Sequence, residues 1–195
     1  MPHKGLRLGT VGVALLALGV WLVVANLPSL LTSQPDGVGP VRPPPVPVTG
    51  DTRKISATLF YVANNGRALE PVAQEVLFSA STAGQARQII EALLGPAPDG
   101  RASAIPSGTE LRALYLTTRG EAFVDVSGEI ISGHPGGSLN EALTVYAIVN
   151  ALTVNLPEVT AVQILVDGSE VDTLNGHLDL RHPLSRSLRL IQRGQ

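Results

Sequence analysis

"GHPGGSLNEALTVYAIVNAL", residues 133–152, joins a glycine-rich loop to an amphipathic segment, and the rest of the chain can be read outward from it. Ser138 is followed three residues later by Glu141, which is the spacing of a capping box at a helix start. Pro157 lies just beyond the expected end of the helix. One apolar stripe at helical spacing indicates a face packed on a core, and it comprises Leu139, Ala142, Leu143, Tyr146, Val149 and Leu152.

A glycine-rich loop before a helix also raises the question of phosphate binding. A phosphate loop needs a lysine for the outer phosphates, and no lysine occurs after Lys54. The dinucleotide fingerprint fails as well, because no clean strand runs into Gly133. Helix capping by Ser138 and Glu141 is therefore the favoured interpretation, with a weakly bound anionic or carbonyl group as the alternative. We expect no cofactor.

The segment before this helix predicts two strands, a helix and a hairpin. Alternation indicates a strand at 55–62, a turn at 64–66, and a weaker strand at 69–78 that Pro71 places at a sheet edge. A helix follows, with Thr82 as cap, Gln85 three residues later, and Gly95 and Pro96 at its end. Two strands at 110–117 and 121–127 then form a hairpin around Arg119 and Gly120.

After the long helix, 159–168 predicts a strong strand with Val162, Ile164 and Val166 on one face, and 177–182 a last extended segment. The order is ββαββαβ. The expected fold class is α+β, a small mixed sheet of about five strands with two helices packed on one face.

The first 31 residues predict a membrane segment. No charged residue occurs from Leu8 to Ala25, and apolar residues continue to Leu31, which is long enough to cross a bilayer. Lys4 and Arg7 precede this run and predict a cytoplasmic amino terminus, with the remainder exported. The alternative is a signal peptide cleaved after Ala25, which would give a secreted protein.

The predicted organisation is therefore an anchor or signal segment at 1–31, a linker rich in Pro and Gly at 32–54, and a folded domain at 55–193. The expected arrangement is a single pass through a membrane at 8–31, with the domain outside.

Composition excludes several functions. The chain has no cysteine, so disulfides, thiolate metal sites and a lipid-modified cysteine are excluded. Aromatic residues make up 4% and acidic residues outnumber basic ones by 16 to 14, which disfavours nucleic acid as a partner.

No catalytic or metal constellation stands out among the polar residues. If 177–182 were a strand, His177, Asp179 and Arg181 would share one face, which is more typical of a surface ion pair than of a zinc site. A glycan hydrolase would need paired carboxylates, and the candidates are Asp125, Glu129 and Glu141. Ser138 lacks the motif of a nucleophile elbow.

Residues 55–184 resemble the sporulation and spore germination (GerMN) domain family. The resemblance is carried in order by "TLFYV", "ARQIIEALLGP", "IPSGTELRALYL", "EAFVDVSGE", "GGSLNEALTVYAIVNALT", "VTAVQILVDG" and "GHLDLRHPL". It implies a bacterial, exported, envelope-associated protein, so the expected location is the bacterial cytoplasmic membrane, with a single pass and the domain on the extracytoplasmic side. It also implies a fold similar to the ring-building modules of secretion systems, and it brings no settled catalytic residues. This chain departs from many relatives because it has no lipobox cysteine and a single copy of the domain.

The expected function is a non-enzymatic envelope module that binds peptidoglycan or an envelope protein. The alternatives are self-association into a ring or other homo-oligomer, with an edge near Pro71, and a peptidoglycan hydrolase. Polar loops reach a partner without disturbing the core. The expected partner-contact loop therefore comprises His134, Gly136, Gly137, Ser138, Asn175 and His177.

Overall fold

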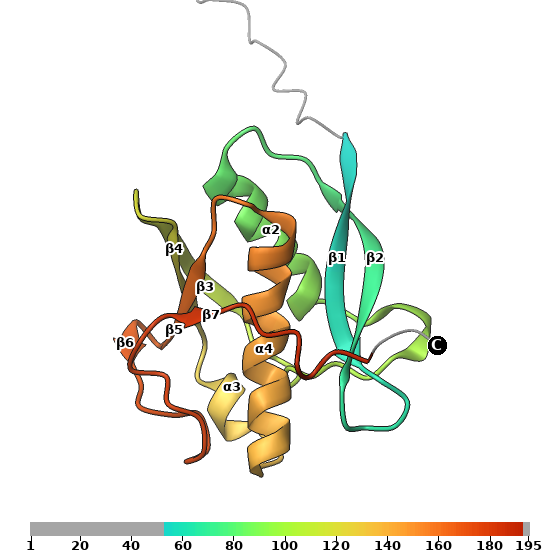
Figure 1. Ribbon diagram of the computed structural model, residues 1–195, viewed down its shortest axis with the longest axis vertical. Coiled ribbons are helices and arrows are strands. Elements are labelled where there is room, and N and C mark those ends of the chain that lie inside the picture. The colour runs from blue at the N-terminus through green and yellow to red at the C-terminus, as the bar shows by residue number, and fades with distance from the viewer. Residues whose placement is uncertain (1–52, 193–195) are drawn as a thin grey trace, which may run out of the picture. The chain divides into compact units, whose positions relative to one another are not determined.

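The computed structural model describes residues 53–192 (Figure 1). The predictions for the segment 1–31 and for almost all of the linker 32–54 lie outside these residues. Within 53–192, no helix is both long and apolar enough to cross a membrane. The segment Thr49–Gln195 forms one compact unit that holds the whole described hydrophobic core. A unit with its own core folds on its own, so it can be produced and tested separately.

The first two strands form a separate two-stranded sheet. β1 (Lys54–Val62) pairs antiparallel with β2 (Leu69–Leu77). The predicted turn between them is confirmed: Gly66 has a positive φ of 67° and Asn65 Oδ1 accepts from the Arg67 N–H. β2 pairs with β1 alone among the described strands, so Pro71 does lie in an edge strand.

The larger sheet contains the other strands, in the order β3-β4-β5-β6 with β7 also paired to β5. It is mixed, as predicted, because β4 and β5 run parallel and the other pairs run antiparallel. The elements are β3 (Leu111–Leu116), β4 (Glu121–Val126), β5 (Ala161–Val166), β6 (Ser169–Glu170) and β7 (Leu184–Ser185).

The prediction of a single sheet is therefore wrong for the first hairpin. The side chain of Asn155 provides a physical reason, because it occupies the outer edge of β1: its Oδ1 accepts from the Thr58 N–H, and its Nδ2 donates to the Thr58 C=O, both at 2.8 Å. A carboxamide has one acceptor and a pair of donors, so it pairs with the strand edge as a neighbouring strand would.

The predicted extended segment at 177–182 is also wrong, since the last strand is β7. Residues 177–182 are a loop, tied down where the Leu180 N–H donates to Asp172 O and Gln163 Nε2 donates to Leu180 O. Leu180 is 1% exposed. Burial of this one leucine and two long-range hydrogen bonds fix the loop without any strand pairing.

Two main helices complete the domain. α2 (Thr82–Leu94) has Ser81, not Thr82, as its N-cap, and Ser81 Oγ accepts from the Gly84 N–H. Gln85 is no capping partner, because its amide bonds Ser79 N and Leu77 O at the end of β2. Gly95 ends the helix, as predicted. A short 3-10 turn, η1 (Pro98–Gly100), and a four-residue helix, α3 (Glu129–Ser132), lie in the connections.

α4 (Ser138–Asn155) is the central element and contacts β1, α2 and β5 (Figure 1). The predicted stripe is only part of its packed surface. Leu143, Val149 and Leu152 are buried, but Leu139 at the first turn is exposed, and polar Thr144 and Asn150 are buried too. A helix covered on most sides belongs to the centre of a fold.

We expect Asn155→Ala to lower the free energy of unfolding by about 2 kcal/mol, because it leaves the Thr58 N–H and C=O without their partner. Urea denaturation of residues 49–195 measures the change. The control is Asn140→Ala on the same helix, whose exposed amide makes one bond to Gly136 O and should lose less than about 1 kcal/mol. Equal losses in the two variants would contradict the assigned role of Asn155.

Candidate functional site

The expected partner-contact residues all lie on connections that leave the carboxyl ends of β4 and β5. β4 leads through α3 into loop 133–138, and β5 leads through Asp167 and β6 into residues 171–177. Where parallel strands end, the loops of an α/β sheet commonly form binding sites. We call loop 133–138 and residues 171–177 together the carboxyl-end loops.

Loop 133–138 is held by its own hydrogen bonds. His134 Nδ1 accepts from the Gly136 N–H at 3.0 Å, and Asn140 Nδ2 donates to Gly136 O at 2.8 Å. Gly136 and Gly137 have positive φ values of 81° and 87°, which side chains other than glycine rarely tolerate. The loop is therefore built as a defined turn that precedes α4.

The predicted capping box at α4 is wrong. Gly137 is the N-cap, and Ser138 is already the first helical residue with no side-chain capping bond. Glu141 points elsewhere and is fully buried. Its Oε1 accepts from the N–H groups of Leu174 and Asn175, and its Oε2 accepts from the N–H of His177, at 2.9 to 3.0 Å.

Glu141 therefore ties residues 174–177 to the start of α4, the helix that follows loop 133–138. Burial alone raises the pKa of its carboxyl, but hydrogen bonds from the backbone of Asn175, Leu178, His177 and Leu174 outweigh burial and leave the pKa below its usual value. Asn175 reaches the other loop, because a Cβ on Gly136 would lie 3.4 Å from Asn175 Oδ1. The structure thus brings the predicted residues of the two loops together.

The exposure of these residues suits contact with a partner. Gly137, Ser138, Asn175 and His177 are exposed, and His134 and Gly136 are half-buried. Two apolar side chains flank loop 133–138, Ile131 with 37% and Leu139 with 38% of the side chain exposed. Exposed apolar groups beside polar loops are typical of interaction surfaces.

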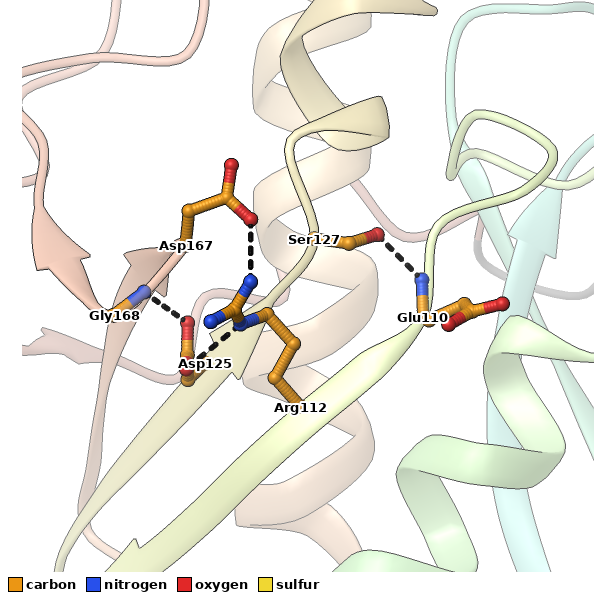
Figure 2. Close-up of polar contacts among 6 residues, drawn as sticks. All are labelled: Glu110, Arg112, Asp125, Ser127, Asp167 and Gly168. Carbon is orange, nitrogen blue, oxygen red and sulfur yellow. Dashed lines mark hydrogen bonds and ion pairs between the residues drawn. The ribbon is translucent and has the colours of Figure 1, made fainter.

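A second polar cluster lies at the same ends of β4 and β5 (Figure 2). Arg112 of β3 lies between two aspartates, with Nη1 at 2.8 Å from Asp167 Oδ1 and Nε at 3.4 Å from Asp125 Oδ2. Asp125 Oδ1 also accepts from the Gly168 N–H at 2.8 Å. This cluster ties β3, β4 and the turn after β5 to one another.

The cluster borders a cleft of about 540 Å³ whose lining includes Glu110, Ser127 and Glu129. Ser127 Oγ accepts from the Glu110 N–H. The pKa of Glu129 lies below its usual value, because its carboxylate makes hydrogen bonds with the Ser127 side chain and with its own backbone N–H.

The partners of Asp125 and Glu141 could not be found from the sequence, because they lie more than 30 residues away or on another strand.

The contacts of Asp125, Glu129 and Glu141 give no support to a glycan-hydrolase pair. Such an enzyme keeps one carboxyl protonated by a raised pKa. The pKa values of Glu129 and Glu141 are both lowered, and Asp125 is bound by Arg112.

Within 53–192, no three His, Asp or Glu side chains are grouped as metal ligands. The expected Asp179–Arg181 surface pair is present at 2.7 Å.

Comparisons with known proteins agree with this fold. The family described as Germane, sporulation and spore germination, matches residues 58–172. No curated protein matches. The first GerMN domain of the sporulation protein GerM from Bacillus subtilis has 23% identity and a TM-score of 0.53, over 68% of this chain and 98% of that one.

The tandem GerMN domains of the same protein have 18% identity and a TM-score of 0.54, over 68% of this chain and 46% of that one. This chain thus spans about half the length of the tandem protein. Similarity at this level of identity shows the fold, and the family match covers more than half of the chain. The chain belongs to the Germane (GerMN) family of sporulation and spore germination domains.

Proposed function

We propose that this protein is an extracytoplasmic envelope module that binds peptidoglycan without catalysis, tethered by residues 8–31. The observation that carries the proposal is the pair of carboxyl-end loops, which approach each other at Asn175 and Gly136 and are flanked by exposed Ile131 and Leu139. Glu141 holds the second loop against the start of α4. Rigid loops with a polar surface and apolar flanks suit recognition of a polymer. An envelope protein is the other partner of this class.

The contacts of the acidic side chains support binding over hydrolysis. Glu141 has both carboxylate oxygens committed to backbone N–H groups, and Asp125 has both committed to Gly168 and Arg112. Neither carboxylate is free to donate a proton to a glycosidic oxygen.

Co-sedimentation of residues 49–195 with isolated cell-wall sacculi, at low and high salt, tests the proposal. Retention at both salts is the expected result, because the apolar flanks are not screened by ions. Loss of retention at both salts would exclude wall binding and leave an envelope protein as the partner.

We expect Leu139→Glu to weaken wall retention about ten-fold, because it places a charge within the apolar flank. The first turn of a helix accepts an acidic residue well, so the fold should be unaffected. The control is Leu77→Glu on β2, which should sediment as the wild type does. Leu77 is another exposed leucine, at 46% against 38% for Leu139, and lies far along the chain from the carboxyl-end loops. Equal effects of the two substitutions would show that the loops are not the contact surface.

Self-association is the second candidate, and one observation favours a different edge from the predicted one. The edge of β2 is partly closed, because the Leu69 N–H donates to Leu190 O and Gln85 Nε2 donates to Leu77 O. β3 is one edge strand of the larger sheet and carries Tyr115, which is 62% exposed. Sedimentation equilibrium tests this candidate, and a strict monomer at high concentration would exclude it.

A further inference from the structure

A small pocket beside the carboxyl-end loops is not used by anything described so far. It has a volume of about 120 Å³ and lies between the end of β1, the 103–106 turn and the start of α4. Its apolar lining includes Val62, Ile105 and Leu143, and its polar lining includes Ser103 and Asn140. Apolar walls with two polar groups are the usual composition of a ligand site.

The size of the pocket limits what can enter. Sites that enclose a whole small molecule measure about 300–1,000 Å³. At about 120 Å³, this pocket holds several water-sized groups and no complete ligand. It therefore fits one terminal group of a larger molecule whose remainder lies outside, against the carboxyl-end loops.

The two polar side chains each retain one free hydrogen-bonding function. Ser103 Oγ accepts from the Ile105 N–H at 3.0 Å, which leaves its O–H as a donor. Asn140 Nδ2 donates to Gly136 O, which leaves Oδ1 as an acceptor. Within residues 53–192, neither remaining function has a protein partner. The pocket thus offers one donor and one acceptor beside an apolar wall.

We propose that this pocket binds the acetamido group of an N-acetylated sugar, an inference that rests in part on the proposed wall binding. An acetamido group has one C=O for Ser103, one N–H for Asn140 and one methyl for the apolar wall. It ends a side branch, so it can enter a small surface pocket end-on, whereas a peptide amide continues into the chain on both sides. A terminal carboxamide such as that of asparagine lacks the methyl and brings a further donor that would need its own acceptor.

Saturation-transfer NMR with N-acetylglucosamine and glucose, on residues 49–195, tests the assignment. The acetyl methyl of N-acetylglucosamine should receive the strongest transfer, and glucose none. Ala104→Leu fills the pocket from its half-buried lining and should abolish the transfer. Ala97→Leu is the matched control, because Ala97 is equally half-buried but does not line the pocket.

Asn140→Ala is a second variant, which keeps the apolar lining of Val62, Ile105 and Leu143 and removes the proposed acceptor. Asn140 is exposed, so folding should persist, and loss of one neutral hydrogen bond should weaken binding about five-fold. This variant decides the question if Ala104→Leu fails to fold.

Three results would overturn the assignment: no transfer to the acetyl methyl, equal transfer to glucose, or transfer that is unchanged in Ala104→Leu and Asn140→Ala. Stronger saturation transfer to trialanine amide than to N-acetylglucosamine, sensitive to Ala104→Leu, would also overturn the assignment in favour of a protein partner.

If Ala104→Leu still sediments with sacculi as the wild type does, the acetamido assignment fails and wall binding stands. If N-acetylglucosamine binds as expected but sacculi do not, wall binding fails and the assignment stands.

Discussion

Glu141→Gln is expected to lower the free energy of unfolding of residues 49–195 by about 3 kcal/mol. The substitution keeps the size of the side chain but removes the charge and turns one acceptor into an amide donor. That donor would face the buried N–H groups of Leu174, Asn175 or His177. Breaking one partner of a buried, charge-assisted network is among the costlier single changes in a protein.

The effect of Glu141→Gln should depend on pH. The pKa of Glu141 is lowered in the folded state from an ordinary 4.5, so its carboxylate stabilises the fold above that value. As the pH falls below 4.5 and through the folded-state pKa, the carboxyl is protonated and this stabilisation is lost. The stabilities of the wild type and the variant should therefore converge in acid.

Urea denaturation between neutral and acidic pH measures both effects. Glu91→Gln on α2 is the control, because Glu91 is exposed and its ion pair with Arg87 spans 3.5 Å, so the change should stay within about 0.5 kcal/mol. A constant difference between Glu141→Gln and the wild type at every pH would show that the charge of Glu141 contributes nothing.

Leu152→Ala is expected to lower the free energy of unfolding by about 3 kcal/mol. Leu152 is fully buried near the end of α4, in the helix that contacts both the β1–β2 hairpin and the larger sheet. Removing its side chain loses buried apolar area and leaves a cavity, because neighbours on several sides are held by separate elements and cannot all close in.

Leu139→Ala on the same helix is the matched control. Leu139 is 38% exposed, so its truncation should cost less than about 1 kcal/mol. Thermal and urea unfolding of the two variants give the comparison. Similar losses in both would mean that α4 is not the centre of the core.

Most elements were predictable because their causes are local. Alternation located β1, β3, β4 and β5, and Gly95 ended α2 as expected. The division into two sheets was not predictable, because it depends on Asn155 reaching Thr58, 97 positions away. The false strand at 177–182 has a similar origin, since Leu180 is fixed by contacts with Asp172 and Gln163 rather than by a neighbouring strand.

The candidate site was predictable in outline but not in its chemistry. Glycines and a histidine before a helix indicated an exposed loop, and Asn175 and His177 indicated its neighbour. The spacing of Ser138 and Glu141 fits a capping box, but neither side chain caps the helix in the structure. The carboxylate serves another purpose, because the N–H groups of Leu174, Asn175 and His177 donate to it and would otherwise lack these acceptors.

The carboxylate of Glu141, which holds residues 174–177 against α4, also has a consequence for the thermodynamics of recognition. Two independent loops would each lose conformational entropy when a partner ordered them, and that loss would oppose association. Here the conformational entropy of residues 174–177 is lost when the chain folds, because Glu141 holds them against α4, the helix that follows loop 133–138. If these loops are the contact surface, as proposed, a ligand meets residues 174–177 already held in place, so fewer contacts are needed for a given affinity.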